Sequence, residues 1–277
     1  MLTTATDAAD ARCLKVPGAR LHYEVRGQGP LVVLVGAPMD AAAFAPLADL
    51  LALDHTVLTT DPRGINRSRL EDPEQESTPQ LRADDLSRLI THVDAGPAVV
   101  VGSSGGAVSA LALAQNHPGL VHTVIAHEPP LIEILEDREQ LRAGTEETVA
   151  AYLAGDVIGA WRKFFAQAGI FMPEPVLEQM FGGARDAQHV ADERRWFTHE
   201  MRASTYWQPD FAALRRAACR IVVGVGQDST GQLCDRTSRA LAQELNTEPA
   251  AFPGGHTGFV ENPDAFASCL RAVMHDS

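Results

Sequence analysis

The chain has 277 residues, of which 45% are hydrophobic and 21% charged, values typical of a globular protein and not of a disordered one. Its formal net charge is -13, from 36 acidic and 23 basic side chains, so we expect neither nucleic acid nor an anionic membrane surface as a partner. This length favours one α/β domain that carries an insertion, because it is long for one simple domain and short for two independent ones.

The N-terminal stretch and the cysteines indicate in which cellular compartment the protein resides. Residues 1–12 contain two aspartates and no apolar segment of the kind that a signal peptide needs. No apolar run in the sequence reaches the length of a membrane span. The cysteines, which form no C-x-x-C pair, are Cys13, Cys219, Cys234 and Cys269. We therefore expect reduced thiols and a cytoplasmic location, with no signal peptide.

Apolar runs separated by turn signals predict strands that alternate with helices, which is the pattern of parallel βαβ units. In chain order, the expected strands are residues 13–16, 21–25, 31–35, 56–60, 99–101, 121–126, 221–226 and 249–252. The first two flank Pro17-Gly18 and are expected to form an antiparallel hairpin. The expected helices, apart from the segment 131–216, are about 40–51, 86–93, 108–116, 234–245 and 266–273. Residues 69–80 are polar and are expected to form a surface loop.

The stretch 99–114 predicts a strand, a tight turn and a helix. Its turn, Gly102-Ser103-Ser104-Gly105-Gly106, fits the pattern G-x-S-x-G with Ser104 in the serine position. In that pattern a serine on a strained turn holds its hydroxyl out of the fold, and the glycines let backbone pass closely. An ordinary glycine-rich turn, or a phosphate site at a helix N-terminus, is the alternative interpretation.

The segment 131–216 differs from the rest of the chain. Strand patterns are absent from it, and it holds most of the aromatic residues, including the three tryptophans. These aromatic side chains form either the core of a small helical subdomain or the inner face of a lid over an apolar pocket. For the second interpretation, the expected pocket residues are Trp161, Phe165, Trp196 and Trp207.

Two further polar residues follow expected strands. Asp228 lies in a polar turn, and His256 lies in a glycine-rich turn. Because the carboxyl ends of parallel strands lie at one edge of a sheet, we expect the loops that carry Ser104, Asp228 and His256 to converge there. This chain order of nucleophile, acid and base is that of a nucleophile-elbow hydrolase. Glu128 follows another strand and is the alternative acid, but we favour Asp228.

Together these features resemble the α/β-hydrolase fold family, over about residues 21–274. The matching motifs are the Gly36 turn, Asp61-Pro62-Arg63-Gly64, the turn 102–106, Asp228 and Gly254-Gly255-His256. The resemblance implies a mostly parallel eight-stranded sheet flanked by helices, with a helical cap inserted after the sixth strand. The implied core comprises residues 1–130 and 217–277, and the implied cap comprises residues 131–216.

The resemblance also implies roles for single residues. Ser104 would attack a carbonyl, His256 would take its proton, and Asp228 would orient the imidazole. The backbone N–H groups of Ala37 and Gly105 would form the oxyanion hole. The chain departs from the family pattern at Val35, where a histidine is usual, and at Asn66, where D-x-R-G-x-G-x-S has its second glycine. Neither departure removes a backbone donor.

The expected function is that of a serine hydrolase that cleaves an ester, thioester or lactone of a largely apolar small molecule through an acyl-enzyme. No cofactor is expected. No metal site is expected either, because His127-Glu128 and His199-Glu200 lack the second histidine of H-E-x-x-H. Two alternatives stay open. The same fold could perform non-hydrolytic or cofactor-free chemistry, such as C–C cleavage, cyclisation or haloperoxidase-like reactions, or the protein could be a non-catalytic small-molecule binder.

Overall fold

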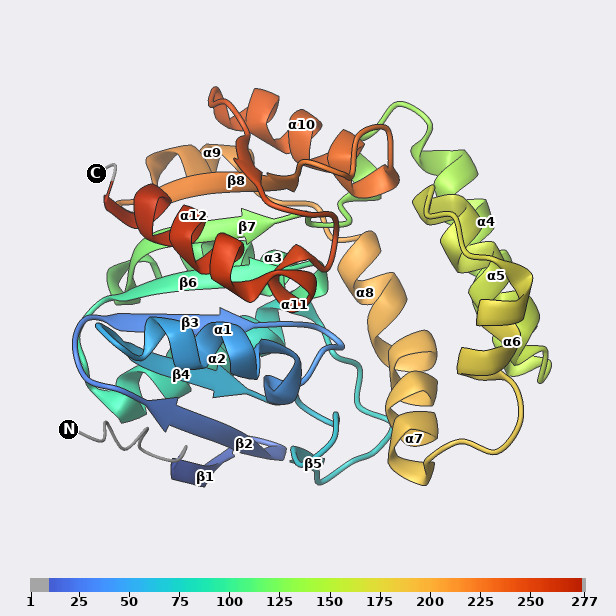
Figure 1. Cartoon of the computed structure of the whole chain (residues 1–277), viewed down its shortest axis with the longest axis horizontal. Helices are drawn as coiled ribbons and strands as arrows, with labels where there is room; N and C mark the ends of the chain where they lie inside the picture. Colours follow the sequence, from blue (N-terminus) through green and yellow to red (C-terminus); the bar gives the residue numbers. More distant parts are fainter. Residues whose placement is uncertain (1–9, 276–277) are drawn as a thin grey trace.

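A central sheet with helices on both faces organises the chain, as the computed structural model shows for residues 10–275 (Figure 1). Its strands are β1 (Asp10–Val16), β2 (Ala19–Arg26), β3 (Leu31–Val35), β4 (Thr56–Thr60), β5 (Arg69–Leu70), β6 (Ala98–Ser103), β7 (Val121–His127), β8 (Arg220–Gly226) and β9 (Ala250–Phe252). The strand order is β1-β2-β4-β3-β6-β7-β8-β9, and β5 pairs with β2 beside this path. The path of eight strands confirms the expected sheet, and the short β5 lies in the segment expected to be a loop.

The strand pairings match the expected mixture of directions. β1 and β2 form the predicted antiparallel hairpin, and β2 also pairs antiparallel with β4. All pairs from β4 through β3, β6, β7 and β8 to β9 are parallel. The carboxyl ends of these parallel strands therefore share one edge of the sheet, where ligands bind in open α/β folds.

The helices of the sheet's two faces are η1 (Ala41–Phe44), α1 (Ala45–Leu51), α2 (Pro79–Val93), α3 (Gly105–Asn116), η2 (Pro118–Leu120), α9 (Phe211–Arg216), α10 (Leu233–Leu245), α11 (Gly258–Glu261) and α12 (Pro263–His275). One apolar cluster packs α2, α3 and α10 on one face of the sheet, and another packs α1, α11 and α12 on the other. Alternate residues of β3 belong to the two clusters: Val33 faces the first, and Leu34 faces the second. This two-sided burial explains why β3 is apolar throughout.

A helical insert lies between β7 and β8 in the sequence and beside the carboxyl ends of the parallel strands (Figure 1). Its elements are η3 (Ile132–Ile134), α4 (Arg138–Leu153), α5 (Val157–Ala168), α6 (Glu174–Phe181), α7 (Ala187–Arg195), the π-helical turn η4 (Trp196–Glu200) and α8 (Met201–Thr205). The Arg195 guanidinium of α7 donates to the carbonyls of Pro73 and Gln75 at 2.9 and 2.6 Å. These bonds fix the insert to the loop that precedes α2.

Two remaining expectations concern the ends of the chain and membranes. Within residues 10–275, no helix is long and apolar enough to cross a bilayer. The prediction that a signal peptide is absent concerns residues 1–12, nearly all of which lie outside the described residues.

Candidate active site

Ser104 sits in a strained turn between β6 and α3. Its backbone has φ 56° and ψ -125°, a conformation that is neither helical nor extended and is costly for a residue with a side chain. The Ser104 N–H donates to the His127 carbonyl at 2.9 Å, which ties the turn to the end of β7. Its partly exposed hydroxyl makes no hydrogen bond to any other described residue. The turn therefore presents a free hydroxyl at the carboxyl edge of the sheet.

Close backbone contacts explain the glycines around this serine. A Cβ atom on Gly106 would lie 2.1 Å from the carbonyl oxygen of Val35, so only glycine lets α3 approach β3 this closely. A Cβ atom on Gly105 would lie 2.6 Å from the carbonyl oxygen of Ala37. The two residues predicted for the oxyanion hole, Ala37 and Gly105, are thus neighbours. Gly105 is also the first residue of α3, where backbone N–H groups lack partners within the helix.

His256 lies in the loop between β9 and α11, and Glu128 holds its ring. His256 Nδ1 and Glu128 Oε2 are 2.6 Å apart. The other oxygen, Oε1, accepts a hydrogen bond of 2.8 Å from the Gly226 N–H at the end of β8. Glu128 is fully buried and has φ 53°, so it is a second strained residue at this edge of the sheet. Both carboxylate oxygens are therefore fixed, one on backbone and one on the imidazole.

The structure does not bring the side chain of Asp228, the expected acid, to His256; the carboxylate at the ring is that of Glu128. The Asp228 side chain is exposed and forms no hydrogen bond with the described residues, although its N–H donates to the Gly254 carbonyl at 3.0 Å. Asp228 thus helps to hold the turn that carries His256 through its backbone only. Glu128 follows β7, which lies next to β6 in the sheet, and this places its carboxylate near the Ser104 turn. The signal in the sequence was an acidic residue that directly follows a strand, β7, in which every residue except His122 is buried.

The charges of this pair shift both pKa values. Burial by itself would raise the pKa of Glu128, but the hydrogen bond and positive charge of His256 outweigh it and lower the pKa to about 2. Burial would lower the pKa of His256, whereas Cys234 and Glu128 beside the ring raise it above its ordinary value of 6.5. Glu128 is therefore ionised at neutral pH, and the protonated imidazole is stabilised.

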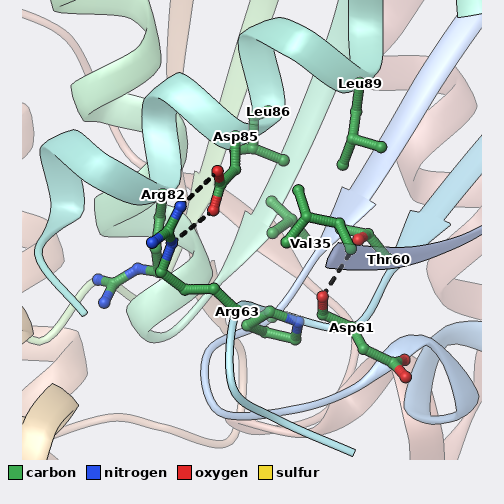
Figure 2. Close-up of a pocket in the computed structure, with 11 residues that line it drawn as sticks. Val35, Thr60, Asp61, Arg63, Arg82, Asp85, Leu86 and Leu89 are labelled. Carbon is green, nitrogen blue, oxygen red and sulfur yellow. Dashed lines mark hydrogen bonds and ion pairs between the residues drawn. The ribbon is translucent and has the colours of Figure 1, made fainter. Parts of the chain in front are cut away.

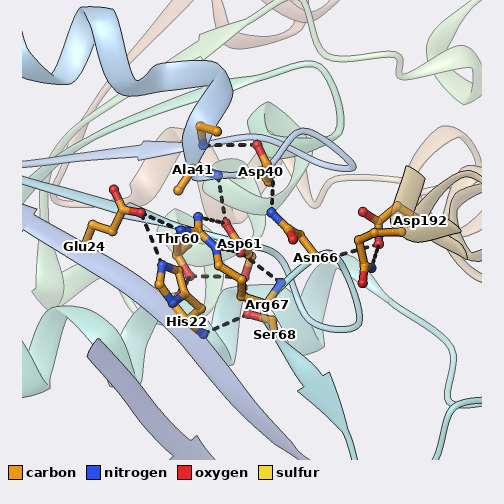
Figure 3. A network of polar contacts seen from close by, with 12 residues as sticks. His22, Glu24, Asp40, Ala41, Thr60, Asp61, Asn66, Arg67, Ser68 and Asp192 are labelled. Atoms are coloured by element: carbon orange, nitrogen blue, oxygen red, sulfur yellow. Dashed lines mark hydrogen bonds and ion pairs between the residues drawn. The ribbon is translucent and has the colours of Figure 1, made fainter. Parts of the chain in front are cut away.

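Asp61 supports the site from the loop after β4 (Figure 3). It is buried, and its carboxylate accepts hydrogen bonds from the Ala41 N–H at 3.0 Å and from Arg67 Nε at 2.7 Å. Asn66 extends the network, because its side-chain amide donates to Asp40 at 2.7 Å and its N–H donates to Asp192 of α7 at 2.9 Å. The network fixes the segment after β3, which contains Ala37, and links it to the insert.

Arg63 of the same motif has a structural role (Figure 2). Its guanidinium forms two bonds of 2.7 Å with the carboxylate of Asp85 on α2, and both groups are buried. The cavity beside this ion pair has a volume of about 20 Å³. Such a volume has room for one water molecule but not for a substrate.

Three of the four aromatic residues expected in a pocket stack on one another. The Trp161 ring lies 5.1 Å from Trp196 and 5.7 Å from Phe165, measured between ring centroids. Trp207 does not join them, because it packs with the apolar cluster of the sheet, α2 and α3. The stacking supports a subdomain core for the insert, and the lid role of these residues stays a prediction.

Comparison with known proteins identifies the family. The model of the alpha/beta hydrolase family matches residues 31–268. The chain belongs to this family. It is 33% identical over 267 residues to an uncharacterized hydrolase, YraK, of Bacillus subtilis, with 94% of each chain covered. This alpha/beta hydrolase also shares its fold with a thermophilic esterase from Thermogutta terrifontis, with a TM-score of 0.67, 21% identity and coverage of 95% and 98% of the two chains. Est816, described as an N-acyl homoserine lactone degrading enzyme, gives a TM-score of 0.70 at 19% identity, with 94% and 99% covered.

Proposed function

We propose that this hydrolase cleaves an ester, thioester or lactone of a largely apolar small molecule through an acyl-enzyme on Ser104. The observation that carries the proposal is a strained serine with a free hydroxyl at the end of β6. At the end of the neighbouring strand, β7, a buried carboxylate binds the His256 imidazole. The Ser104 N–H bonds to the His127 carbonyl, and the next residue, Glu128, holds His256. Nucleophile, base and orienting acid are the three parts that acyl transfer needs.

The residues act in a defined order. His256 takes the proton of Ser104 Oγ while this oxygen attacks the substrate carbonyl, and the same proton then goes to the leaving alcohol or thiol. Glu128 accepts the Nδ1–H bond, fixes the tautomer and stabilises the imidazolium. The N–H groups of Ala37 and Gly105 receive the developing oxyanion, and losing one donor of this kind costs about 3–4 kcal/mol. Water activated by His256 then hydrolyses the acyl-enzyme.

Two structural neighbours support the substrate class. The neighbours in structure include a protein named as an esterase and another named as a lactone-degrading enzyme. That the substrate is largely apolar stays a prediction from the aromatic composition of the insert, whose stacked rings form its own core.

Hydrolysis of p-nitrophenyl esters tests the proposal and its pH dependence together. Only neutral imidazole can take the serine proton, and the neighbours of His256 raise its pKa above 6.5. We therefore expect kcat/KM to rise with pH and to fall about tenfold per pH unit below that pKa. Rates that are unchanged between acid and neutral pH, or no hydrolysis from acetate to octanoate esters, would contradict the proposal.

A further inference from the structure

We propose that Glu128, Cys234 and His256 form a binding site for a soft divalent cation such as Zn²⁺, and that an ion bound there inhibits the enzyme. The inhibitory part rests on the proposed function, because it requires His256 to be the base. The sequence predicts no metal site, since no metal motif is present. The three ligands come from the loop after β7, the first turn of α10 and the loop before α11, which only the fold brings together.

The geometry of the cluster fits one small ion. Glu128, Cys234 and His256 each offer one ligand atom, and these atoms all lie within 4.8 Å of one another. Around a tetrahedral zinc ion, with bonds of about 2.0–2.3 Å, ligand atoms lie about 3.3–3.7 Å apart. Shifts of about an ångström would therefore let the three atoms bind one ion. Three protein ligands leave the fourth position to water.

The chemistry of the cluster also fits. Thiolate, imidazole and carboxylate are the ligands that zinc selects, and the thiolate disfavours Mg²⁺ and Ca²⁺. Glu128 is buried, whereas Cys234 and His256 are partly exposed, with 23% of the His256 side chain accessible. An ion can thus enter from the solvent side and meet a carboxylate that is already fixed by the Gly226 N–H. The thiolate and the carboxylate together neutralise its charge.

A bound ion would prevent His256 from acting as a base, whichever ring nitrogen the ion occupies. An ion on Nε2 occupies the basic atom itself. An ion on Nδ1 displaces the bond to Glu128 Oε2, and the remaining ring proton then resides on Nε2. In both cases His256 cannot accept the proton of Ser104. An ion bound at this site therefore inhibits the acyl transfer that Ser104, His256 and Glu128 are proposed to perform.

Cobalt absorption in the full-length Ser104→Ala variant tests the site without any reliance on activity. We expect Co²⁺ to produce a thiolate-to-cobalt charge-transfer band and tetrahedral visible bands, which Zn²⁺ abolishes. Adding Cys234→Ser should remove the charge-transfer band, whereas adding Cys13→Ser, at an exposed cysteine of β1, should keep it. No band, or the same band without Cys234, would overturn the site.

Inhibition is a separate measurement on the protein with Ser104 present. We expect Zn²⁺ to inhibit p-nitrophenyl butyrate hydrolysis and EDTA to reverse the inhibition. In Cys234→Ser the Zn²⁺ concentration for half inhibition, relative to the activity of the same variant without metal, should rise about tenfold or more. Cobalt binding without inhibition would refute the inhibitory role alone, whereas a protein inert toward every ester would refute the proposed function and leave the cobalt result standing.

Discussion

Replacing Ser104 by alanine is expected to lower kcat for p-nitrophenyl butyrate by roughly 10⁴–10⁶, because no other group can form the acyl-enzyme. The free energy of unfolding should change little, since the lost hydroxyl bonds to no described residue and alanine meets the same strained backbone. Steady-state kinetics and denaturant unfolding of the same preparations measure both quantities.

The adjacent serine is the matched control for this variant. The Ser103 hydroxyl is buried and lies 3.3 Å from His127 Nδ1, so Ser103→Ala should cost some stability but less than about tenfold in kcat. If Ser104→Ala kept a tenth of the native kcat, the serine mechanism would be wrong.

The second large effect separates the two carboxylates. Glu128→Gln is expected to lower kcat by roughly 10³–10⁴, and Asp228→Asn by less than about threefold. A glutamine that keeps the bond from the Gly226 N–H turns its NH₂ group toward His256 Nδ1. Nδ1 must then accept a hydrogen bond, so the neutral imidazole carries its proton on Nε2 and cannot take the serine proton there. The variant also loses the negative charge that stabilises the imidazolium.

Kinetics of the two single variants, with unfolding curves for each, make this comparison. The low pKa of Glu128, about 2, keeps its carboxylate charged at every practical assay pH, so protonation cannot mimic the variant. A large loss in Asp228→Asn with little effect in Glu128→Gln would restore Asp228 as the acid.

Local motifs made much of the fold and part of the site predictable. The strand, turn and helix around Ser104 require glycines within a few residues, and the alternation of apolar runs determines the parallel sheet. His256, the proposed base, was predicted because it follows a strand in a glycine-rich turn. The motif around Ser104 and the turn around His256 are each confined to one short stretch, so no long-range contact is needed to recognise them.

The choice of acid depended on contacts between distant segments. Glu128 and Asp228 both follow strands that end at the same edge, so their order along the chain could not separate them. The positive φ and burial of Glu128 direct its carboxylate to His256, whereas Asp228 ends exposed. Long-range contacts also place Cys234 and Trp207. Cys234 belongs to no cysteine motif in the sequence but lies beside His256. Trp207 belongs to the aromatic-rich segment but packs on the sheet.

Fluorophosphonate labelling followed by peptide mapping shows directly whether Ser104 is the nucleophile. We expect one phosphonylated peptide, modified at Ser104, in the native protein and in Ser103→Ala, and none in Ser104→Ala. A native protein that stays unlabelled, or a label on a residue other than Ser104, would contradict this role.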